Sequence, residues 1–488
     1  MKPRVFAFLL LGVAIALPFT IRADQERNSR DRDDRDCRDN DHHEHNVKTP
    51  VGLIGVIPVP GNPITSADIA WVDPGTERYY VADRSNFGVD IIDAENDLFV
   101  ARVTGMAGPL TSGGGTIDKN GGGPNGVLVT PKRQLWAGDG NSTVQIADVD
   151  PTTMTGLPFK SVSTAIAACD TNTPPGSPSS STGHWCGRAD ELGYDPIDHL
   201  ILIANNAPLS PTKICPTMTN PMAHCPIDPY ATFISSNPPY AVLGHISFTG
   251  ATGLEQPLWD PELRRFWLTV PGGVPAGNPW GVPAGNPLIA RIDPKTMMAE
   301  PIEPPGKKAK SIPLDCVALT GTASASTAGI ALAPFQHLLV SACGFPIAVN
   351  ALTGANKLVT KNVGGGDEVW YNSGDGRFFV TGLNTATPPV QQLGVIDAEH
   401  GTWLQNVSDA SGKFASGKNT SAFPENNHIF TIAQIPAANA NFAPPPLMPT
   451  HGDPTKDVSV CTLFGFRGTG CIAVYTHSGE EEAERDDK

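Results

Sequence analysis

Short runs of β-branched and aromatic residues recur through residues 50–478, and Asp, Gly, Asn and Pro residues separate them. The clearest group has four runs, which begin at Asp68, Arg78, Val89 and Leu98. Runs of this length and composition, bounded by turn-forming residues, are typical of β-strands joined by short connections. The pattern therefore predicts a small antiparallel sheet of four strands.

The same order of runs occurs in seven units, each of about sixty residues with insertions. The six later units begin near the following residues: Asn125, Asp190, Glu255, Ala328, Asp367 and Thr420. One four-stranded sheet leaves apolar residues uncovered on both faces, so repeated sheets pack on one another around an axis. We therefore predict an all-β fold, a seven-bladed β-propeller of four-stranded antiparallel blades. A pair of β-sandwiches is the structural alternative, which the recurrence of one order disfavours.

Long segments rich in Pro, Ser, Asn and Gly interrupt the units at residues 161–185, 208–240, 270–287 and 435–456. Loops longer than about 15 residues are often either functional or disordered. If several of these insertions lie on one face of the propeller, they would form the walls of a pocket over the axis.

The two ends of the chain differ in composition from the body at residues 50–478. Residues 1–23 combine a basic start, an apolar run and a small-residue cleavage site, which is the pattern of a signal peptide. The highly charged residues 24–49 and the acidic residues 479–488 are predicted to be disordered tails. The chain is therefore predicted to be secreted or periplasmic, without a membrane span after removal of the signal.

Eight of the nine cysteines lie in the body. Eight cysteines allow many connectivities, of which pairing between sequence neighbours is the favoured one. It gives the following disulfides: Cys169–Cys186, Cys215–Cys225, Cys316–Cys343 and Cys461–Cys471. Disulfides agree with an oxidising compartment, and the lack of a C-x-x-C motif disfavours zinc and thiol-redox chemistry.

Composition narrows the classes of partner. The formal net charge of −15 disfavours nucleic acid and anionic membranes, because both select for Lys and Arg. The 50 Gly and 47 Pro residues disfavour helix bundles. We expect a monomer that binds a small molecule or another protein at its loop face.

A polar residue recurs at the start of the first strand in five units: Asp68, Asn125, Asp190, Glu255 and Asp367. The first strand of a propeller blade is innermost, so these side chains are predicted to surround one end of the axis. Carboxylates at close range raise one another's pKa values. A divalent cation with oxygen ligands, above all Ca²⁺, would neutralise them. The alternative is structural, because Asp and Asn also cap turns and accept hydrogen bonds from neighbouring backbone N–H groups.

The third run of each unit carries a resemblance to known propellers. Val89-Asp-Ile-Ile-Asp93 and Leu393-Gly-Val-Ile-Asp397 lead into turns that begin with Asp. In these motifs the body resembles the YVTN and NHL groups of β-propellers. The resemblance covers most of the body and implies an architecture, not an activity.

Two strand starts resemble those of an enzyme family. Glu255-Gln-Pro-Leu-Trp-Asp-Pro resembles the Glu-x-Pro-x-Trp-Asp opening of the senescence-marker/gluconolactonase propellers, and Pro124-Asn125-Gly126 resembles their Pro-Asn-Gly motif. The resemblance implies that Glu255 and Asn125 bind one divalent metal. It also implies that Asp190 or Asp367 acts as a ligand or general base in lactone or ester hydrolysis. That family has six blades, and the order of its motifs differs from the order here.

Two functions are therefore predicted. The first is an exported binding protein that presents a loop-walled pocket over the central channel, with a divalent cation on the axis. The second is a Ca²⁺-dependent hydrolase of lactones or esters, in which the metal polarises the carbonyl and activates water, with Asp190 and Asp367 as catalytic residues. The motifs of serine hydrolases and zincins, G-x-S-x-G and H-E-x-x-H, do not occur.

Overall fold

The computed structural model describes residues 50–477, apart from 110–120, 141, 167–186, 207–208, 215–223, 273–284, 304–306, 308–309, 323–325, 384–390, 408–418, 436–454, 456 and 458. The predicted signal peptide and both predicted tails lie outside the described residues, as do large parts of the predicted insertions. Among the residues that the structure does describe, we find no helix with the length and apolar character that crossing a membrane requires.

The described residues form seven blades and almost no helix. Each blade has four antiparallel strands in a row, and the blades are numbered 1 to 7 in the order of their first strands along the chain. The first four blades comprise β2 (Ala70–Asp73), β3 (Arg78–Asp83), β4 (Gly88–Asp93) and β5 (Leu98–Thr104); β6 (Val127–Thr130), β7 (Gln134–Asp139), β8 (Thr143–Asp148) and β9 (Pro158–Ser163); β10 (Arg188–Asp195), β11 (Leu200–Asn206), β14 (Tyr230–Ser235) and β15 (Val242–Ser247); β16 (Pro257–Asp260), β17 (Arg265–Val270), β18 (Leu288–Asp293) and β19 (Met298–Ala299), with β20 (Ile312–Pro313) added beside β18.

The other three blades comprise β21 (Thr327–Ala333), β22 (Leu338–Cys343), β23 (Pro346–Asn350) and β24 (Asn356–Leu358); β25 (Val369–Asn372), β26 (Arg377–Leu383), β27 (Gln391–Asp397) and β28 (Thr402–Val407); β29 (Thr420–Phe423), β30 (His428–Ala433), β31 (Cys471–His477) and β1 (Val51–Ile57). The remaining elements are β12 (Leu209–Ile214), β13 (His224–Pro226), α1 (Cys316–Thr320), η1 (Arg84–Asn86) and η2 (Val460–Phe464). The predicted fold, an all-β propeller with seven four-stranded blades, is confirmed.

The core lies between the blades. Successive side chains of a strand point to opposite faces of its sheet, so both faces of each blade need cover. Between blades 1 and 7, Val72 and Tyr79 pack with Phe430 and Ile432, all of them buried. The rings of Tyr79 and Phe430 stack with their centroids 4.7 Å apart. Burial between neighbours is the physical reason why a sheet of this size occurs as a repeat.

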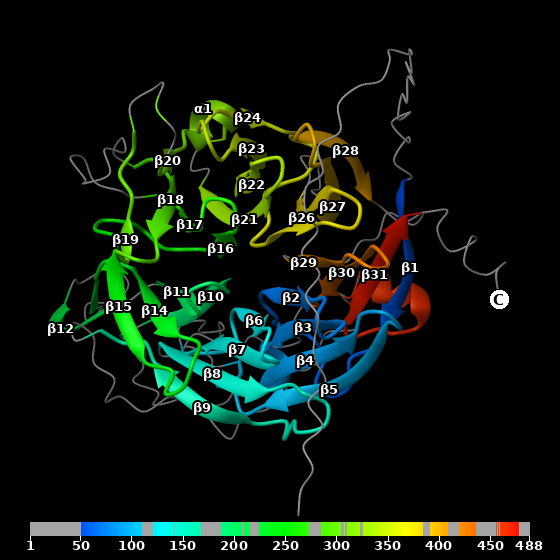
Figure 1. Cartoon of the computed structure of the whole chain (residues 1–488). Helices are drawn as coiled ribbons and strands as arrows, with labels where there is room; N and C mark the ends of the chain where they lie inside the picture. The colour runs from blue at the N-terminus through cyan, green and yellow to red at the C-terminus, as the bar shows by residue number, and fades with distance from the viewer. Residues whose placement is uncertain are drawn as a thin grey trace, which may run out of the picture. The chain divides into compact units, whose positions relative to one another are not determined.

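The ring of blades closes through a strand from the beginning of the body. β1 pairs antiparallel with β31 and is the outer strand of blade 7, as the blue and red strands in Figure 1 show. Gln405 of blade 6 binds the same strand: the Val51 N–H donates to its Oε1 at 3.0 Å, and its Nε2 donates to the Val51 carbonyl at 2.9 Å. The sequence pattern does not mark residues 51–57 as a blade strand, because their partner lies at the opposite end of the chain.

The insertion predicted at 208–240 is shorter than expected. Residues Tyr230–Ser235 are β14, the third strand of blade 3, which pairs with β11 on one side and β15 on the other. Pro residues lie on both sides of this run, which gives the whole segment the composition of a loop. Backbone pairing with β11 and β15 overrides that local composition.

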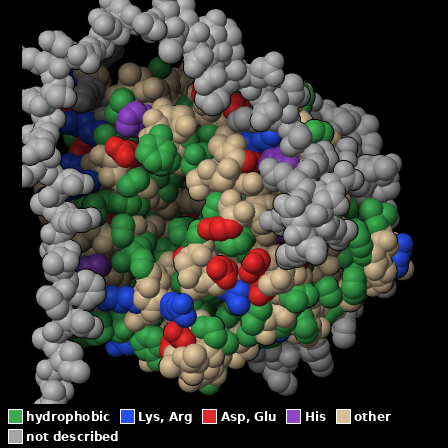
Figure 2. Space-filling model, turned by 45° about the vertical axis from the view of Figure 1, so that its right-hand side comes forward, with side chains coloured by type: hydrophobic (Ala, Val, Ile, Leu, Met, Phe, Trp, Pro, Cys, Tyr) green, Lys and Arg blue, Asp and Glu red, His purple; other side chains and the backbone are tan. Residues whose placement is uncertain are grey.

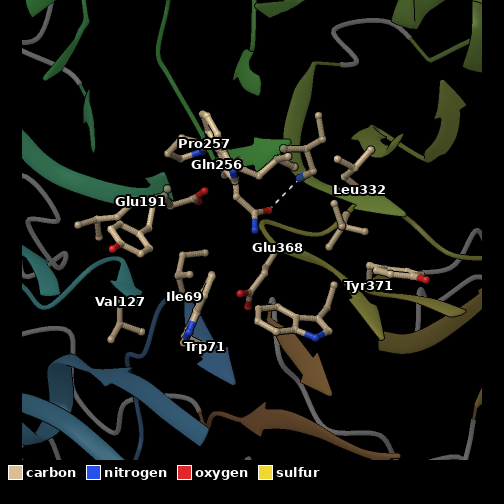
Figure 3. A pocket seen from close by; sticks show the side chains of 18 residues that line it. Ile69, Trp71, Val127, Glu191, Gln256, Pro257, Leu332, Glu368 and Tyr371 are labelled. Atoms are coloured by element: carbon tan, nitrogen blue, oxygen red, sulfur yellow. Dashed lines mark hydrogen bonds between the residues drawn. The ribbon is translucent and has the colours of Figure 1, made fainter. Parts of the chain in front are cut away.

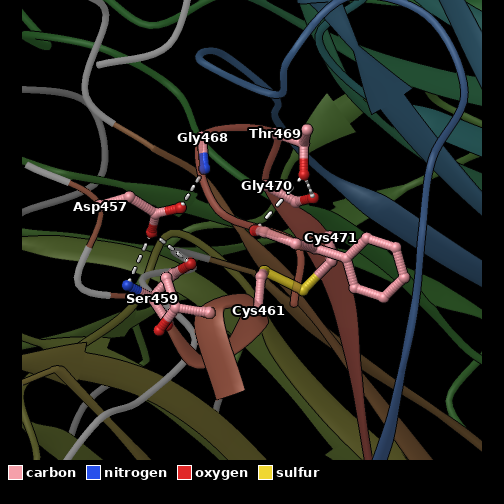
Figure 4. The surroundings of a disulfide bond; sticks show 9 residues. Asp457, Ser459, Cys461, Gly468, Thr469, Gly470 and Cys471 are labelled. Atoms are coloured by element: carbon pink, nitrogen blue, oxygen red, sulfur yellow. Dashed lines mark hydrogen bonds between the residues drawn. A yellow bond between two sulfur atoms is a disulfide. The ribbon is translucent and has the colours of Figure 1, made fainter. Parts of the chain in front are cut away.

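Two of the predicted disulfides are present. Cys316 pairs with Cys343, and Cys461 with Cys471, with Cα–Cα distances of 5.4 and 5.8 Å. Figure 4 shows the second, which joins η2 to the start of β31. The predicted pairs Cys169–Cys186 and Cys215–Cys225 involve residues outside the described part of the chain.

The first strands of neighbouring blades approach closely where two glycines lie. A Cβ atom on Gly126 would lie 2.6 Å from Cα of Glu191, and a Cβ atom on Gly329 would lie 2.6 Å from the carbonyl oxygen of Asp367. Real Cβ atoms do not approach backbone so closely, so these two positions have no room for a side chain. The inner diameter of the propeller therefore depends on glycine at these positions.

We expect Gly126→Ala to lower the free energy of unfolding by about 2–3 kcal/mol, because overpacking against a backbone that cannot move costs about 1–3 kcal/mol or more. Urea denaturation followed by tryptophan fluorescence measures the effect. Gly55→Ala is the matched control, because a Cβ atom there meets nothing within 4 Å. Equal stability of the two variants would contradict the close approach of the first strands.

Candidate functional site

The first strand of each blade lies innermost, around the axis of the propeller (Figure 1). The five residues predicted from the strand starts lie in or just before these strands: Asp68 before β2, Asn125 before β6, Asp190 in β10, Glu255 before β16 and Asp367 before β25. The first three are buried, and the last two are half-buried.

Arg84 links the starts of blades 1 and 2. Its side chain is buried, and Nη2 donates to Oδ2 of Asp68 and to Oδ1 of Asn125, the latter at 2.6 Å. Nε donates to the same Asn125 oxygen at 3.0 Å. Nδ2 of Asn125 in turn donates to the carbonyl of Ala189 in blade 3, at 3.1 Å. One guanidinium thus neutralises a predicted ligand and occupies the amide oxygen of another.

Arg188 has the corresponding role in blade 3. Its Nη2 lies 2.6 Å from Oδ2 of Asp190, which also accepts a hydrogen bond from Nδ2 of Asn206 at 2.8 Å. Burial opposes protonation of Arg188, but the nearby carboxylates of Asp190, Asp68 and Glu255 raise its pKa above the ordinary value. Carboxylates from three blades therefore act on one guanidinium.

At three of the predicted positions, the next residue in the sequence is also polar and lies at the axis. These residues are Glu191, Gln256 and Glu368. In blade 3 the pairing of β10 with β11 shifts register between Ala189 and Leu192. Such an irregularity redirects side chains, which explains how consecutive residues of one strand both lie at the axis.

These three side chains are held by their neighbours to different extents. Oε1 of Gln256 accepts a hydrogen bond from the Ile330 N–H at 2.8 Å, and Oε2 of Glu368 accepts one from the Ala70 N–H at 3.4 Å. Glu191 and Glu368 are 3% and 0% exposed. Figure 3 shows the side chains of all three directed into the space between the first strands.

That space is a cavity of about 230 Å³, lined by the first strands of blades 1 to 6 and the residues that precede them. Much of the wall is apolar, with Ile69, Val127 and Leu332 among the residues labelled in Figure 3. The space-filling view in Figure 2 shows a hollow with hydrophobic side chains around it and acidic side chains beside it. Clefts with an apolar wall and a few polar groups are typical of small-molecule sites.

Aromatic side chains form another part of the wall. Trp71, Trp259, Trp370, Tyr194 and Tyr371 all line the cavity. The rings of Trp71 and Trp370 meet edge to face, with centroids 5.4 Å apart, and the indole N–H of Trp370 donates to the carbonyl of Ala422 at 3.2 Å. The tryptophans at the first strands therefore contribute to the contacts between blades and also face the axial space.

Burial and like charges act together on the acidic groups. Burial raises the pKa of Glu191 well above its usual range, and the carboxylates of Glu255 and Asp190 raise it further. Burial also raises the pKa of Glu368 well above its usual range, which the hydrogen bond from the Ala70 N–H partly opposes. Burial, with Asp190 nearby, raises the pKa of Glu255 to about 8. The axial space is therefore an unfavourable place for negative charge without a compensating cation.

Whether a calcium ion fits here depends on how many oxygen atoms of the five predicted ligands are free to bind it. Arg84 holds oxygens of Asp68 and Asn125, and Arg188 holds one of Asp190, so three of the five predicted ligands are engaged by guanidinium groups. In the part of the chain that the structure describes, no three His, Cys, Asp or Glu side chains are arranged to hold a metal ion. As they stand, these side chains do not form an oxygen shell, and the calcium site stays a prediction.

Sequence reasoning missed four charged groups of this site: Arg84, Arg188, Glu191 and Glu368. The two glutamates had a visible signal, because each directly follows a predicted ligand in the sequence. Arg188 had one too, because it lies two residues before Asp190 in the same strand, where such side chains share a face. Arg84 had none, since it comes 16 residues after its partner Asp68 and belongs to η1. Only the fold of blade 1 brings Arg84 and Asp68 together.

No family model matches the sequence, and no curated protein matches it significantly. A solved structure described as "Crystal Structure of Mitotic Checkpoint Complex" contains a similar chain, with 12% sequence identity and a TM-score of 0.46, over 86% of this chain and 96% of that chain. The strand pairing described above is the basis for assigning the propeller fold, and the resemblance to the YVTN and NHL groups stays a prediction.

We expect Arg84→Met to lower the free energy of unfolding by about 3–5 kcal/mol, because it leaves the buried carboxylate of Asp68 without its cation. Chemical denaturation measures the loss, and the double variant Asp68→Asn with Arg84→Met should recover part of it. Arg133→Met is the control: its partner Asp150 lies 3.2 Å away, with side chains 47% and 32% exposed. An exposed pair of this kind contributes up to about 1 kcal/mol. Similar losses from both single variants would show that Arg84 does not neutralise a buried charge.

Proposed function

We propose that this protein is a binding protein that holds a small molecule in the axial cavity of its propeller. The observation that supports this most directly is the cavity itself, which six blades line and to which four of them contribute polar and aromatic side chains. Strands on every side hold these residues in place, so little ordering would be needed when a ligand binds. The two described disulfides support the predicted secreted or periplasmic location.

The predicted hydrolase of lactones or esters is the less supported function. It requires a metal whose predicted ligands Asp68, Asn125 and Asp190 are hydrogen-bonded to arginine. Its two predicted catalytic residues lie in different surroundings: Asp190 is paired with Arg188, whereas Asp367 is half-buried. The insertions predicted to form a loop-walled pocket lie largely outside the described residues, so the proposal uses the axial cavity alone.

Filling the cavity should abolish binding. In a thermal-shift screen of small cationic, neutral and anionic aromatic compounds, we expect some to raise the melting temperature of the native protein. A ligand at about 100 times its Kd adds about 2.7 kcal/mol to stability. Leu332→Trp, which replaces a small aliphatic side chain of the cavity wall by a bulky indole ring, should remove these shifts. Leu243→Trp, on an exposed position of the outer strand β15, should retain them. If no compound of any charge shifts the melting temperature, the proposed function is wrong.

Removal of divalent metal tests the alternative. Because Arg84 and Arg188 already neutralise Asp68 and Asp190, we expect a chelator to leave the melting temperature unchanged and Ca²⁺ to add no stability. Elemental analysis of the purified protein gives an independent measurement. Bound calcium, together with a fall in melting temperature on chelation, would support the metal site and would justify assays with lactone and ester substrates.

A further inference from the structure

Acidic groups outnumber basic groups around the axial cavity. Six carboxylates interact electrostatically there: Asp68, Asp190, Glu191, Glu255, Asp367 and Glu368. Two guanidiniums face them, and these pair with Asp68 and Asp190. Among the described residues, Glu191 and Glu368 have no ion-pair partner. A buried carboxylate without a cation is costly unless it is protonated or a ligand neutralises it.

Several polar atoms of the cavity wall also lack a hydrogen-bond partner. They are Oε2 of Glu191, Oε1 of Glu368 and the indole N–H groups of Trp71 and Trp259. Folded proteins satisfy nearly all of their buried polar groups, so each exception needs an explanation. Here four of them belong to residues that line one cavity. One bound molecule would provide hydrogen-bond partners for all four atoms. Without such a molecule, the lack of a partner would need a separate explanation for each atom.

The kinds of group in the wall determine which class of molecule fits. Carboxylates attract a cation, accept hydrogen bonds from an ammonium and repel an anion. The faces of Trp and Tyr rings attract cations and cover apolar groups. A divalent metal ion such as Ca²⁺ requires a shell of oxygen ligands, and the carboxylates are not grouped as metal ligands in the described part of the chain.

We infer that the axial cavity binds an organic cation, a small molecule with an N–H-bearing ammonium group on an apolar body. This inference rests on the proposed function and names the class of its ligand. The ammonium donates hydrogen bonds to the unpartnered oxygens of Glu191 and Glu368, which extend from opposite blades of the wall in Figure 3. The apolar body packs against the aromatic wall, where the N–H groups of Trp71 and Trp259 suit a hydroxyl or ether oxygen on the ligand.

Three probes of similar size and different charge test this in the native protein. They are 2-phenylethylammonium, 2-phenylethanol and 3-phenylpropanoate, titrated at equal ionic strength by calorimetry and by fluorescence of the cavity tryptophans. We expect the ammonium to bind about tenfold or more tightly than the alcohol, because it adds charge-assisted hydrogen bonds and cation–π contacts, and we expect no binding of the carboxylate. Equal or tighter binding of the alcohol or the carboxylate would overturn the inference.

Two isosteric variants test the assigned residues. Glu191→Gln and Glu368→Gln should each weaken ammonium binding by about tenfold and leave binding of the alcohol unchanged. Glu262→Gln, an exposed residue between β16 and β17, is the control and should change neither. Circular dichroism verifies folding. If a variant does not fold, the series of three probes with the native protein still decides the inference. Ammonium binding that is the same in both folded variants as in the native protein would overturn it.

The outcomes also separate this inference from the proposed function. Binding of neutral or anionic compounds that Leu332→Trp abolishes, without preference for the ammonium, would overturn the ligand class and leave the binding function intact. No binding by any compound of the screen would overturn both. Stabilisation by millimolar Ca²⁺ and not by the ammonium would overturn the inference in favour of a metal site.

Discussion

Carboxylates from several blades are buried around one axis, and the rest of the structure has to accommodate their repulsion. In a low-dielectric interior, like charges at close range are unfavourable unless cations or protons compensate them. Arg84 and Arg188 supply two cations from inside the fold, and they bind Asp68 and Asp190 directly. The remaining acidic groups are kept together by the backbone to which they are attached, and not by attraction to one another.

The backbone can hold the acidic groups close together because each first strand is fixed on several sides. It pairs with the second strand of its own blade and lies beside the first strands of its neighbours. Gly126 and Gly329 permit the closest of these approaches. The pairing of β1 with β31 then completes blade 7, which packs against blade 1 and so closes the ring. A wall built in this way is in place before any ligand arrives, which lowers the cost of binding.

The buried acidic groups at the axis bear on both the stability and the function of the protein. A buried acidic group without a partner costs stability, so stability alone does not explain Glu191 and Glu368. Both have an unpartnered oxygen in a cavity with aromatic walls. Binding sites commonly retain such groups at a cost to the unliganded protein, because the ligand provides the missing partner. The axial cavity and its acidic residues are therefore most simply understood together.

Much of the fold could be predicted from local pattern. The recurring runs that begin with residues such as Asp68 and Arg78 indicate strands, and their repetition in one order indicates a propeller, because a single such sheet cannot cover its own faces. Two of the strands that this reasoning did not find show its physical limit. β14 lies within a Pro-rich segment, and β1 belongs to the blade at the other end of the chain, so neither has a local signal that outweighs its surroundings.

For the site, the sequence by itself determined which polar residues occur at the starts of the first strands, because turn chemistry and strand period fix those positions locally. Only the tertiary structure decided what surrounds them. Arg84 reaches Asn125 of the next blade, Asn125 reaches the Ala189 carbonyl of blade 3, and a register shift in β10 brings Glu191 to the axis. Such contacts depend on the distance between blades and on the local path of the backbone, and neither is encoded in the spacing of residues along the chain.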